Sequence, residues 1–335
     1  MGNEIRLQGI EGHAGAMKTN VLVTGASGFV GRKIVEALQP DRELALSVLL
    51  RNPDKDRVLT ARGARIYKGD IGDPETLKEA LAGKEIVIHS AALMSNFDSF
   101  PREEFYRINA AGTENMLKAC DPARLERFLH ISTVGVYGDA PSAYEWSKKE
   151  SERIVLKYAK ERAIPFTILR PSQLYGPGMR YGWPQTIKSI KTGRMVIPGN
   201  GRARVHLLNI ADLAAAVKLT LRNDSAKNRI YDIAGPEVLS IGEVFDIISE
   251  DLGVRPPARV PFSIIYFSAC VLRLIPSRLK SAWLRLLTPH RLEFFARDHV
   301  YDMDAAQKEL GFNPKVRVRE GFTEMIRWCE QEGLI

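Results

Sequence analysis

Short apolar runs alternate with amphipathic stretches from residue 21 to residue 252. The apolar runs are rich in β-branched residues and predict buried strands at residues 21–24, 44–50, 64–68, 85–89, 127–133 and 229–235. Apolar positions at helical spacing predict helices at residues 32–38, 102–120 and 240–252, and another helix that opens at Tyr144. This alternation of strand, loop and helix predicts an α/β fold, in which a parallel sheet carries helices on both faces.

Three glycines stand between the first strand and the first helix, in the segment Thr24-Gly25-Ala26-Ser27-Gly28-Phe29-Val30-Gly31. Glycine lets the backbone turn off the strand, approach a pyrophosphate and pack the helix against the strand. The free N–H groups and the positive dipole end of the helix then face the anion. This context predicts a dinucleotide site in a doubly wound parallel sheet (Rossmann). Ligands of such sheets bind at the carboxyl ends of the strands, which here hold Gly25, Arg51, Asp70, Ala91 and Thr133.

The second strand ends at Arg51, twenty residues after Gly31. An NAD-binding domain usually carries an acidic residue there, which binds the hydroxyls of the adenosine ribose, whereas a guanidinium suits a 2′-phosphate. Lys55 and Arg57 add positive charge nearby. We therefore expect NADP(H) as the cofactor and keep NAD as the alternative. The competing interpretation is that Arg51 is only a solvated strand end.

Tyr144 and Lys148 are four residues apart, so both side chains lie on one face of the predicted helix. A free tyrosine titrates near pH ~10, and a nearby ammonium and an oxidised nicotinamide lower that pKa toward the working pH of an acid/base catalyst. Thr133 ends the preceding strand, where its hydroxyl can hydrogen-bond to a substrate oxygen. Alone, this spacing is more typical of a solvated helix face, but after a dinucleotide turn it predicts a catalytic site.

Two other polar residues fall inside predicted elements. Asn109 is a poor helix former in the middle of a helical stretch. It either shapes the site through hydrogen bonds, and we include it among the catalytic candidates, or it faces solvent. His89 ends a buried strand, and we expect it to be structural rather than catalytic.

The alternation loosens after Gly178, where we expect the substrate to bind. Residues 180–204 hold turns and several basic residues, which either contact an anionic substrate or form a solvated rim. The apolar run 262–272 lies within residues 261–295 and is too short to span a bilayer. We interpret it as an ordinary core helix. The alternatives are a helix over an apolar substrate pocket and an interfacial helix that contacts an anionic membrane peripherally. We expect a dinucleotide-binding domain at 17–178 and 206–236, and a smaller, mostly helical C-terminal substrate-binding region at 179–205 and 237–335.

The net charge and the cysteine content indicate which partners and which cellular compartment to expect. The formal net charge of +8 favours anionic partners, which a phosphorylated cofactor satisfies. Nucleic acid is not expected, because no basic stripe is interleaved with aromatic residues. Cys120, Cys270 and Cys329 give neither a disulfide framework nor a metal pattern, so we expect no metal and a reducing, cytoplasmic location. Residues 1–16 are polar and aperiodic, and we expect a disordered extension.

These motifs resemble the extended short-chain dehydrogenases/reductases, in the epimerase/dehydratase and 3β-hydroxysteroid-dehydrogenase-like group. The resemblance covers nearly all of residues 18–330. Beyond the glycine turn it is carried by Gly69-Asp70-Ile71, His89-Ser90-Ala91-Ala92, residues 109–113, 132–138 and 170–178, the pair Tyr144 and Lys148, and Ala211-Asp212-Leu213-Ala214. It implies that Tyr144 is the acid/base, that Lys148 holds the nicotinamide ribose and that Thr133 polarises the substrate oxygen.

The resemblance also implies a cofactor site and an assembly. Asp70 and Ile71 would border the adenine, and Pro171 the nicotinamide. The expected cofactor-binding set is Gly25, Ser27, Gly28, Phe29, Val30, Gly31, Arg51, Asp70, Ile71, Ala91, Ala92, Lys148 and Pro171. Helices near 102–120 and 144–162 would pair across a homodimer.

Three functions remain open on the sequence. The first is an NADP(H)-dependent oxidoreductase that moves a hydride between the nicotinamide and a carbonyl or hydroxyl carbon of a small molecule. The second is an NAD-dependent nucleotide-sugar 4-epimerase, and the third is a non-catalytic dinucleotide-binding subunit. Val134-Gly135 follows Thr133 where the 4,6-dehydratases of the family carry an Asp-Glu pair, which argues against water elimination.

Overall fold

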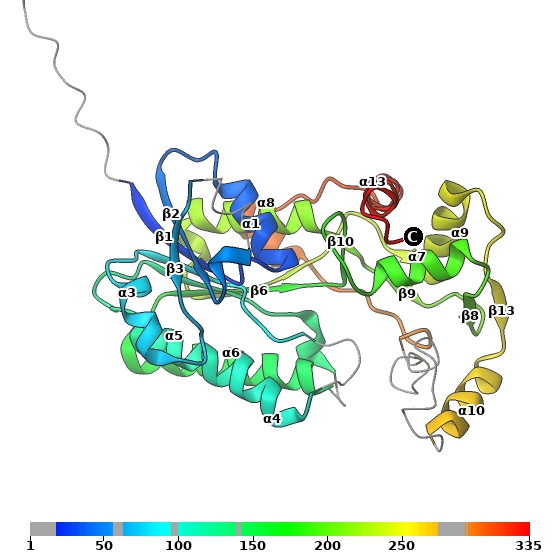
Figure 1. Ribbon diagram of the computed structural model, residues 1–335, viewed down its shortest axis with the longest axis horizontal. Coiled ribbons are helices and arrows are strands. Elements are labelled where there is room, and N and C mark those ends of the chain that lie inside the picture. Colours follow the sequence, from blue (N-terminus) through cyan, green and yellow to red (C-terminus); the bar gives the residue numbers. More distant parts are fainter. Residues whose placement is uncertain (1–17, 56–62, 95–99, 139–141, 274–291, 293) are drawn as a thin grey trace, which may run out of the picture.

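A parallel seven-stranded sheet forms the centre of the molecule (Figure 1). The computed structural model describes residues 18–55, 63–94, 100–138, 142–273, 292 and 294–335. In spatial order the strands are β11 (Arg229–Ile233), β6 (Phe166–Pro171), β5 (Arg127–Ile131), β4 (Ile86–His89), β1 (Thr19–Thr24), β2 (Leu44–Leu50) and β3 (Arg65–Lys68). The order reverses between β1 and β4, and a crevice for ligands opens at such a point in a doubly wound sheet. The predicted fold class is confirmed.

Helices cover both faces of the sheet, as predicted (Figure 1). One face packs on α1 (Phe29–Leu38) and α8 (Ile210–Arg222), through buried residues such as Ile34 and Leu213. The other face packs on α3 (Leu77–Leu81), α5 (Gly112–Ala119) and α6 (Ala143–Arg162), through residues such as Leu117 and Val155. Side chains cap several helix starts: Ser142 and Ser240 form capping boxes with Glu145 and Glu243.

The helical stretch 102–120 departs from a regular α-helix. It consists of α4 (Arg102–Phe105), a π-helical turn (Tyr106–Ala111) and α5. The expectation of one continuous helix is therefore corrected by an inserted wide turn, which is a feature often found at functional sites. Asn109 lies in this turn.

A smaller unit of helices and short strand pairs lies beyond the carboxyl ends of the sheet's strands (Figure 1). Its core joins α7 (Trp183–Lys191), α9 (Ile241–Leu252) and α13 (Val318–Gln331). The short strands are β7 (Leu174–Tyr175), β8 (Val196–Pro198), β9 (Arg204–Val205), β10 (Leu208–Asn209), β12 (Leu239–Ser240) and β13 (Ala258–Val260). Helix α12 (Asp304–Leu310) lies in the C-terminal part of the chain, and its residues Ala306 and Leu310 pack in the core of the large sheet.

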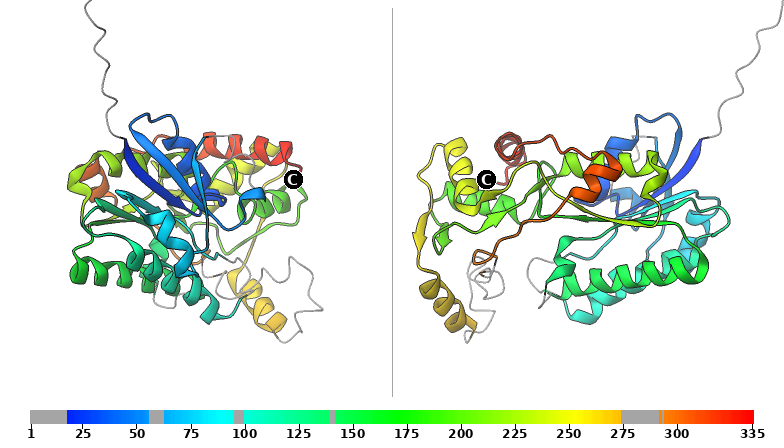
Figure 2. Two further views of the ribbon diagram at one scale, coloured as in Figure 1. Left: turned by 60° about the vertical axis from the view of Figure 1, so that its left-hand side comes forward. Right: turned by 180° about the vertical axis from the view of Figure 1, so that it is seen from behind.

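Helix α10 (Phe262–Arg273) stands out from the rest of the described chain in all three views (Figure 1, Figure 2). Among its described side chains only Ile265 is buried, and Ile264, Phe267 and Val271 are exposed. The interpretation of this run as an ordinary core helix is wrong. Within the described residues, no helix is long and apolar enough to cross a membrane. Residues 1–16, Arg57 and residues 274–291 and 293 of the 261–295 stretch lie outside the described residues.

Candidate active site

A cavity of about 1410 Å³ runs along the carboxyl edge of the sheet and into the smaller unit. A site for a single drug-sized ligand usually measures about 300–1,000 Å³, so this cavity has room for a cofactor and a substrate together. Every predicted cofactor-binding residue lines it, and so do Thr133, Tyr144 and Lys148. Asn109 does not line it.

The glycine turn between β1 and α1 has the shape that a dinucleotide requires. Gly25 has φ +73°, and a Cβ there would come within 2.7 Å of the Ala91 backbone nitrogen. A Cβ on Gly31 would lie 2.2 Å from the Gly25 carbonyl oxygen, so helix and turn pack together only with glycine there. No side chain caps the start of α1, which leaves its first N–H groups for an anion. The residues present fit the pyrophosphate of a nicotinamide dinucleotide.

The opposite side of the turn holds groups suited to the adenosine half. Arg51 is exposed at the end of β2, lines the cavity and has no ion-pair partner among the described residues. Asp70 accepts a hydrogen bond from the Gly72 N–H at 2.7 Å, which orders the turn after β3. Arg107 also lines the cavity beside Asp70. Sequence reasoning missed Arg107, because it falls on a helical stretch with no motif of its own.

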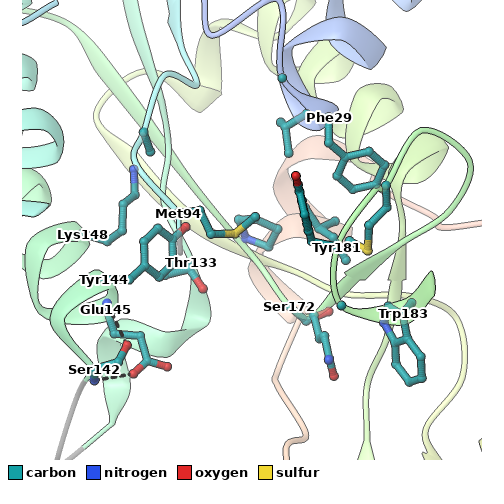
Figure 3. A pocket seen from close by; sticks show the side chains of 18 of the residues that line it. Phe29, Met94, Thr133, Ser142, Tyr144, Glu145, Lys148, Ser172, Tyr181 and Trp183 are labelled. Carbon is teal, nitrogen blue, oxygen red and sulfur yellow. Dashed lines mark hydrogen bonds between the residues drawn. The ribbon is translucent and has the colours of Figure 1, made fainter. Parts of the chain in front are cut away.

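Thr133, Tyr144 and Lys148 come together on one wall of the cavity (Figure 3). Thr133 caps a short 3₁₀ helix: its hydroxyl oxygen accepts a hydrogen bond from the Gly135 N–H at 3.1 Å. The hydroxyl hydrogen therefore stays available to a ligand oxygen. Tyr144 points into the same space, and Figure 3 shows Met94 between it and Phe29 of the glycine turn.

The side chain of Lys148 contacts the last two residues of β5. Its ammonium donates a hydrogen bond to the Ile131 carbonyl at 2.7 Å and lies 3.3 Å from His130 Nε2. Burial lowers the pKa of Lys148 to about 8, although the Glu152 carboxylate opposes this shift. Burial and the Lys148 charge hold the pKa of His130 well below its usual value, so the imidazole is neutral at neutral pH. Sequence reasoning read His130 only as part of a strand, since nothing in the pattern showed that it meets Lys148.

The pKa of Tyr144 differs from the expectation. Burial, with the Glu145 carboxylate adding to it, raises the pKa of Tyr144 to about 12. Both causes oppose the lowering that we expected from Lys148, whose ammonium donates to the Ile131 carbonyl. The phenol therefore keeps its proton at neutral pH, which is the form that protonates a carbonyl oxygen.

These pKa values predict the pH dependence of cofactor capture. The charged Lys148 ammonium is present below about pH 8 and is lost above it, so kcat/KM for a nicotinamide cofactor held by Lys148 should fall about tenfold per pH unit on the alkaline side. The Glu152→Gln chain lacks the carboxylate that raises the Lys148 pKa, and its falling limb should begin at lower pH. This assignment would be contradicted if kcat/KM began to fall only near the ordinary lysine pKa. It would also be contradicted if Glu152→Gln left the pH of the fall unchanged.

Asn109 and His89 support the wall without lining the cavity. Asn109 is buried, accepts a hydrogen bond from the Leu93 N–H at 2.6 Å and donates to Ser147 Oγ at 2.8 Å. It therefore ties the segment after β4 to the helix that carries Tyr144, and we class it as a positioning residue rather than a catalytic one. His89 lies between Thr24 Oγ1 and Thr113 Oγ1, and its expected structural role agrees with this buried position.

Some basic residues at 180–204 line the cavity, where an anionic substrate could contact them, and others form ion pairs at the surface. Lys188 and Arg194 line the cavity. Lys191 pairs with Glu330 at 3.2 Å and Arg204 with Asp298 at 2.7 Å, both at the surface. The rest of the wall in this half is mainly apolar.

Comparisons with known proteins agree with this architecture. A profile described as "NAD dependent epimerase/dehydratase family" matches residues 21–234. The chain is 25% identical to 4-hydroxy-2-methyl-3-oxo-4-farnesyl-3,4-dihydroquinoline-1-oxide ketoreductase of Stigmatella aurantiaca, over 89% of this chain and 93% of that one. It is 25% identical to 2-alkyl-3-oxoalkanoate reductase of Stenotrophomonas maltophilia, over 91% and 98%. The structure of UDP-glucuronic acid 4-epimerase from Bacillus cereus with UDP-glucuronic acid and NAD matches at a TM-score of 0.75 and 22% identity, over 94% of this chain and 100% of that one.

Proposed function

The chain belongs to the NAD-dependent epimerase/dehydratase family of extended short-chain dehydrogenases/reductases, and from that premise we propose that it is an NADP(H)-dependent oxidoreductase. The reaction moves a hydride between the nicotinamide and a carbonyl or hydroxyl carbon of a small-molecule substrate, with Tyr144 as the acid/base. The observation that carries this proposal is that Thr133, Tyr144 and Lys148 line the same cavity as the glycine turn.

The cofactor would lie along the cavity, on Gly25–Gly31 at one end and beside Lys148 and Pro171 at the other. When bound, it supplies the hydride. Thr133 donates its free hydroxyl hydrogen to the substrate oxygen, which orients the carbonyl. Tyr144 gives its proton to that oxygen as the carbon receives the hydride, so the carbonyl becomes an alcohol. Lys148 stays charged below about pH 8, binds the cofactor's ribose and stabilises the phenolate that Tyr144 leaves behind.

The direction and the cofactor rest on separate observations. The Tyr144 phenol carries its proton at neutral pH, as reduction of a carbonyl requires, and two of the similar proteins are named a ketoreductase and a reductase. For the cofactor, Arg51 offers a free guanidinium at the adenosine end and no carboxylate for a ribose diol. This favours NADP(H), with NAD as the alternative.

Incubation with NADPH and a series of aldehydes and ketones tests the proposal. We expect a cofactor that dissociates readily and one alcohol formed per NADPH oxidised. NAD that survives purification, together with interconversion of nucleotide sugars and no net redox change, would assign the chain to the 4-epimerases instead. Turnover no higher than that of a Tyr144→Phe chain would leave a non-catalytic dinucleotide-binding subunit.

We also propose partners and a compartment. A homodimer would form through the helices at 102–120 and 144–162, where Tyr106 and Leu156 are exposed apolar side chains. A peripheral membrane contact would use residues 261–295. The three cysteines are free, which suits the reducing cytoplasm.

A further inference from the structure

Helix α10 presents an apolar stripe that no described residue covers. Ile264, Phe267 and Val271 are 57%, 71% and 45% exposed. Their spacing of three and four residues places them on one side of the helix. A contiguous patch of exposed apolar side chains often marks an interaction site.

The other side of α10 belongs to the cavity wall. Ile265 is buried against Leu292, with Val260 and Phe262 packed beside them. Both Ile265 and Leu292 line the cavity that holds Tyr144. The exposed stripe and the cavity therefore lie on two sides of the same helix.

The half of the cavity away from the glycine turn is suited to an apolar ligand. Its wall includes Met179, Trp183, Met195, Phe245, Phe294 and Phe295. These side chains come from separate segments of the smaller unit and converge on one space. A ligand that removes this apolar surface from water gains free energy, and Lys188 and Arg194, which line the same half, can contact an anionic group of the ligand.

The sequence before and after α10 is strongly basic, and this charge indicates what covers the stripe. Residues 252–292 contain Arg255, Arg259, Arg273, Arg278, Lys280, Arg285 and Arg291 and no aspartate or glutamate. This stretch carries nearly all of the chain's net charge of +8. Arg255 and Arg259 are exposed, and neither takes part in an ion pair among the described residues. A second copy that docked through this stretch would bring the same net positive charge against it, which opposes association. An apolar stripe that is flanked in sequence by basic residues instead matches the surface of an anionic bilayer.

We propose that α10 docks the protein on an anionic lipid bilayer, and that the cavity behind it receives a lipid-soluble carbonyl compound from that bilayer. The docking does not depend on the reaction. The substrate class rests on the proposed oxidoreductase function, since only that function makes the ligand a carbonyl compound.

Co-sedimentation of the full chain with lipid vesicles tests the docking. We expect binding to vesicles of phosphatidylcholine with phosphatidylglycerol, and at least about tenfold weaker binding to phosphatidylcholine alone. Phe267→Asp should weaken vesicle binding at least about tenfold, because it places a charge in the apolar stripe. The double variant Ile264→Ser/Phe267→Ser should weaken binding equally, and it leaves the charge of residues 252–292 unchanged.

Val238→Asp is the matched control, because Val238 is an exposed apolar residue at a distance from α10 in sequence, with 39% exposure. It should bind vesicles as the parent does. All of these positions are exposed, so the variants should fold, and unchanged NADPH affinity checks this. Equal vesicle binding by the parent and Phe267→Asp would overturn the docking. A stripe variant that dissociates a dimer and leaves vesicle binding intact would assign α10 to a second copy.

The substrate class is tested with two ketones. A long-chain ketone presented in anionic vesicles should be reduced at least about tenfold more slowly by Phe267→Asp than by the parent, whereas a short water-soluble ketone should be reduced equally by both. Equal rates on the vesicle-borne ketone would overturn delivery from the bilayer. Vesicle binding without oxidation of NADPH on either ketone would overturn the proposed function and the substrate class, and would leave the docking in place.

Discussion

A Tyr144→Phe chain is expected to lose turnover by about 10²–10⁴-fold while it binds NADPH as the parent does. The substitution removes one hydroxyl from a half-buried side chain on the cavity wall. That hydroxyl is the proton donor in the proposed reaction, and its raised pKa of about 12 keeps it protonated at neutral pH. The ring remains, so the wall of the cavity keeps its shape.

Tyr158→Phe is the control for this result. Tyr158 lies on the same helix, α6, but its hydroxyl donates to Glu114 at 3.1 Å and does not line the cavity. Its loss should cost about 1 kcal/mol of stability at most, with no change in turnover. The measurement is a steady-state assay of the parent, Tyr144→Phe and Tyr158→Phe. Turnover of Tyr144→Phe equal to that of the parent would remove Tyr144 from the mechanism.

Arg51→Asp should reverse the cofactor preference. A charge-assisted contact to a phosphate contributes about 1.5–3 kcal/mol, so NADPH affinity should fall by about 10–150-fold. The new carboxylate repels a 2′-phosphate and accepts hydrogen bonds from ribose hydroxyls, so NADH affinity should rise. The measurement is the dissociation constant of each cofactor, read from its fluorescence.

The matched control changes the same charge at the other end of β2. Arg42 is exposed just before that strand and does not line the cavity. Arg42→Asp should leave the ratio of the two dissociation constants unchanged. If both substitutions lower NADPH affinity equally, Arg51 acts only through the net charge and the proposed 2′-phosphate contact does not exist.

The sheet and its ligand-binding edge could be predicted from the sequence because both follow from local patterns. A buried parallel strand is apolar throughout its length, and a right-handed crossover places the next loop at the same edge. Gly25, Arg51, Asp70, Ala91 and Thr133 were therefore expected at one edge before any contact was known, and all line one cavity.

The features that sequence missed depend on contacts between distant segments. The spacing of Tyr144 and Lys148 predicts their common face, but the pKa of Tyr144 depends on its burial in the folded protein and on the Glu145 carboxylate. The apolar composition of 262–272 is the same for a core helix and a docking helix, so only the observed exposure of Phe267 distinguishes them. The π-helical turn at Asn109 changes the register of hydrogen bonds without changing the apolar pattern.

In the proposed reaction, one dinucleotide reaches from the glycine turn to the phenol of Tyr144 and the ammonium of Lys148 on the cavity wall. We would test this with a crystal structure of the protein bound to NADP. We expect the pyrophosphate at Gly25–Gly31, the 2′-phosphate at Arg51 and the nicotinamide ribose within hydrogen-bond reach of Lys148, with the ring beside Tyr144. A nicotinamide that lies away from Tyr144 and Lys148, or a dinucleotide outside this cavity, would contradict it.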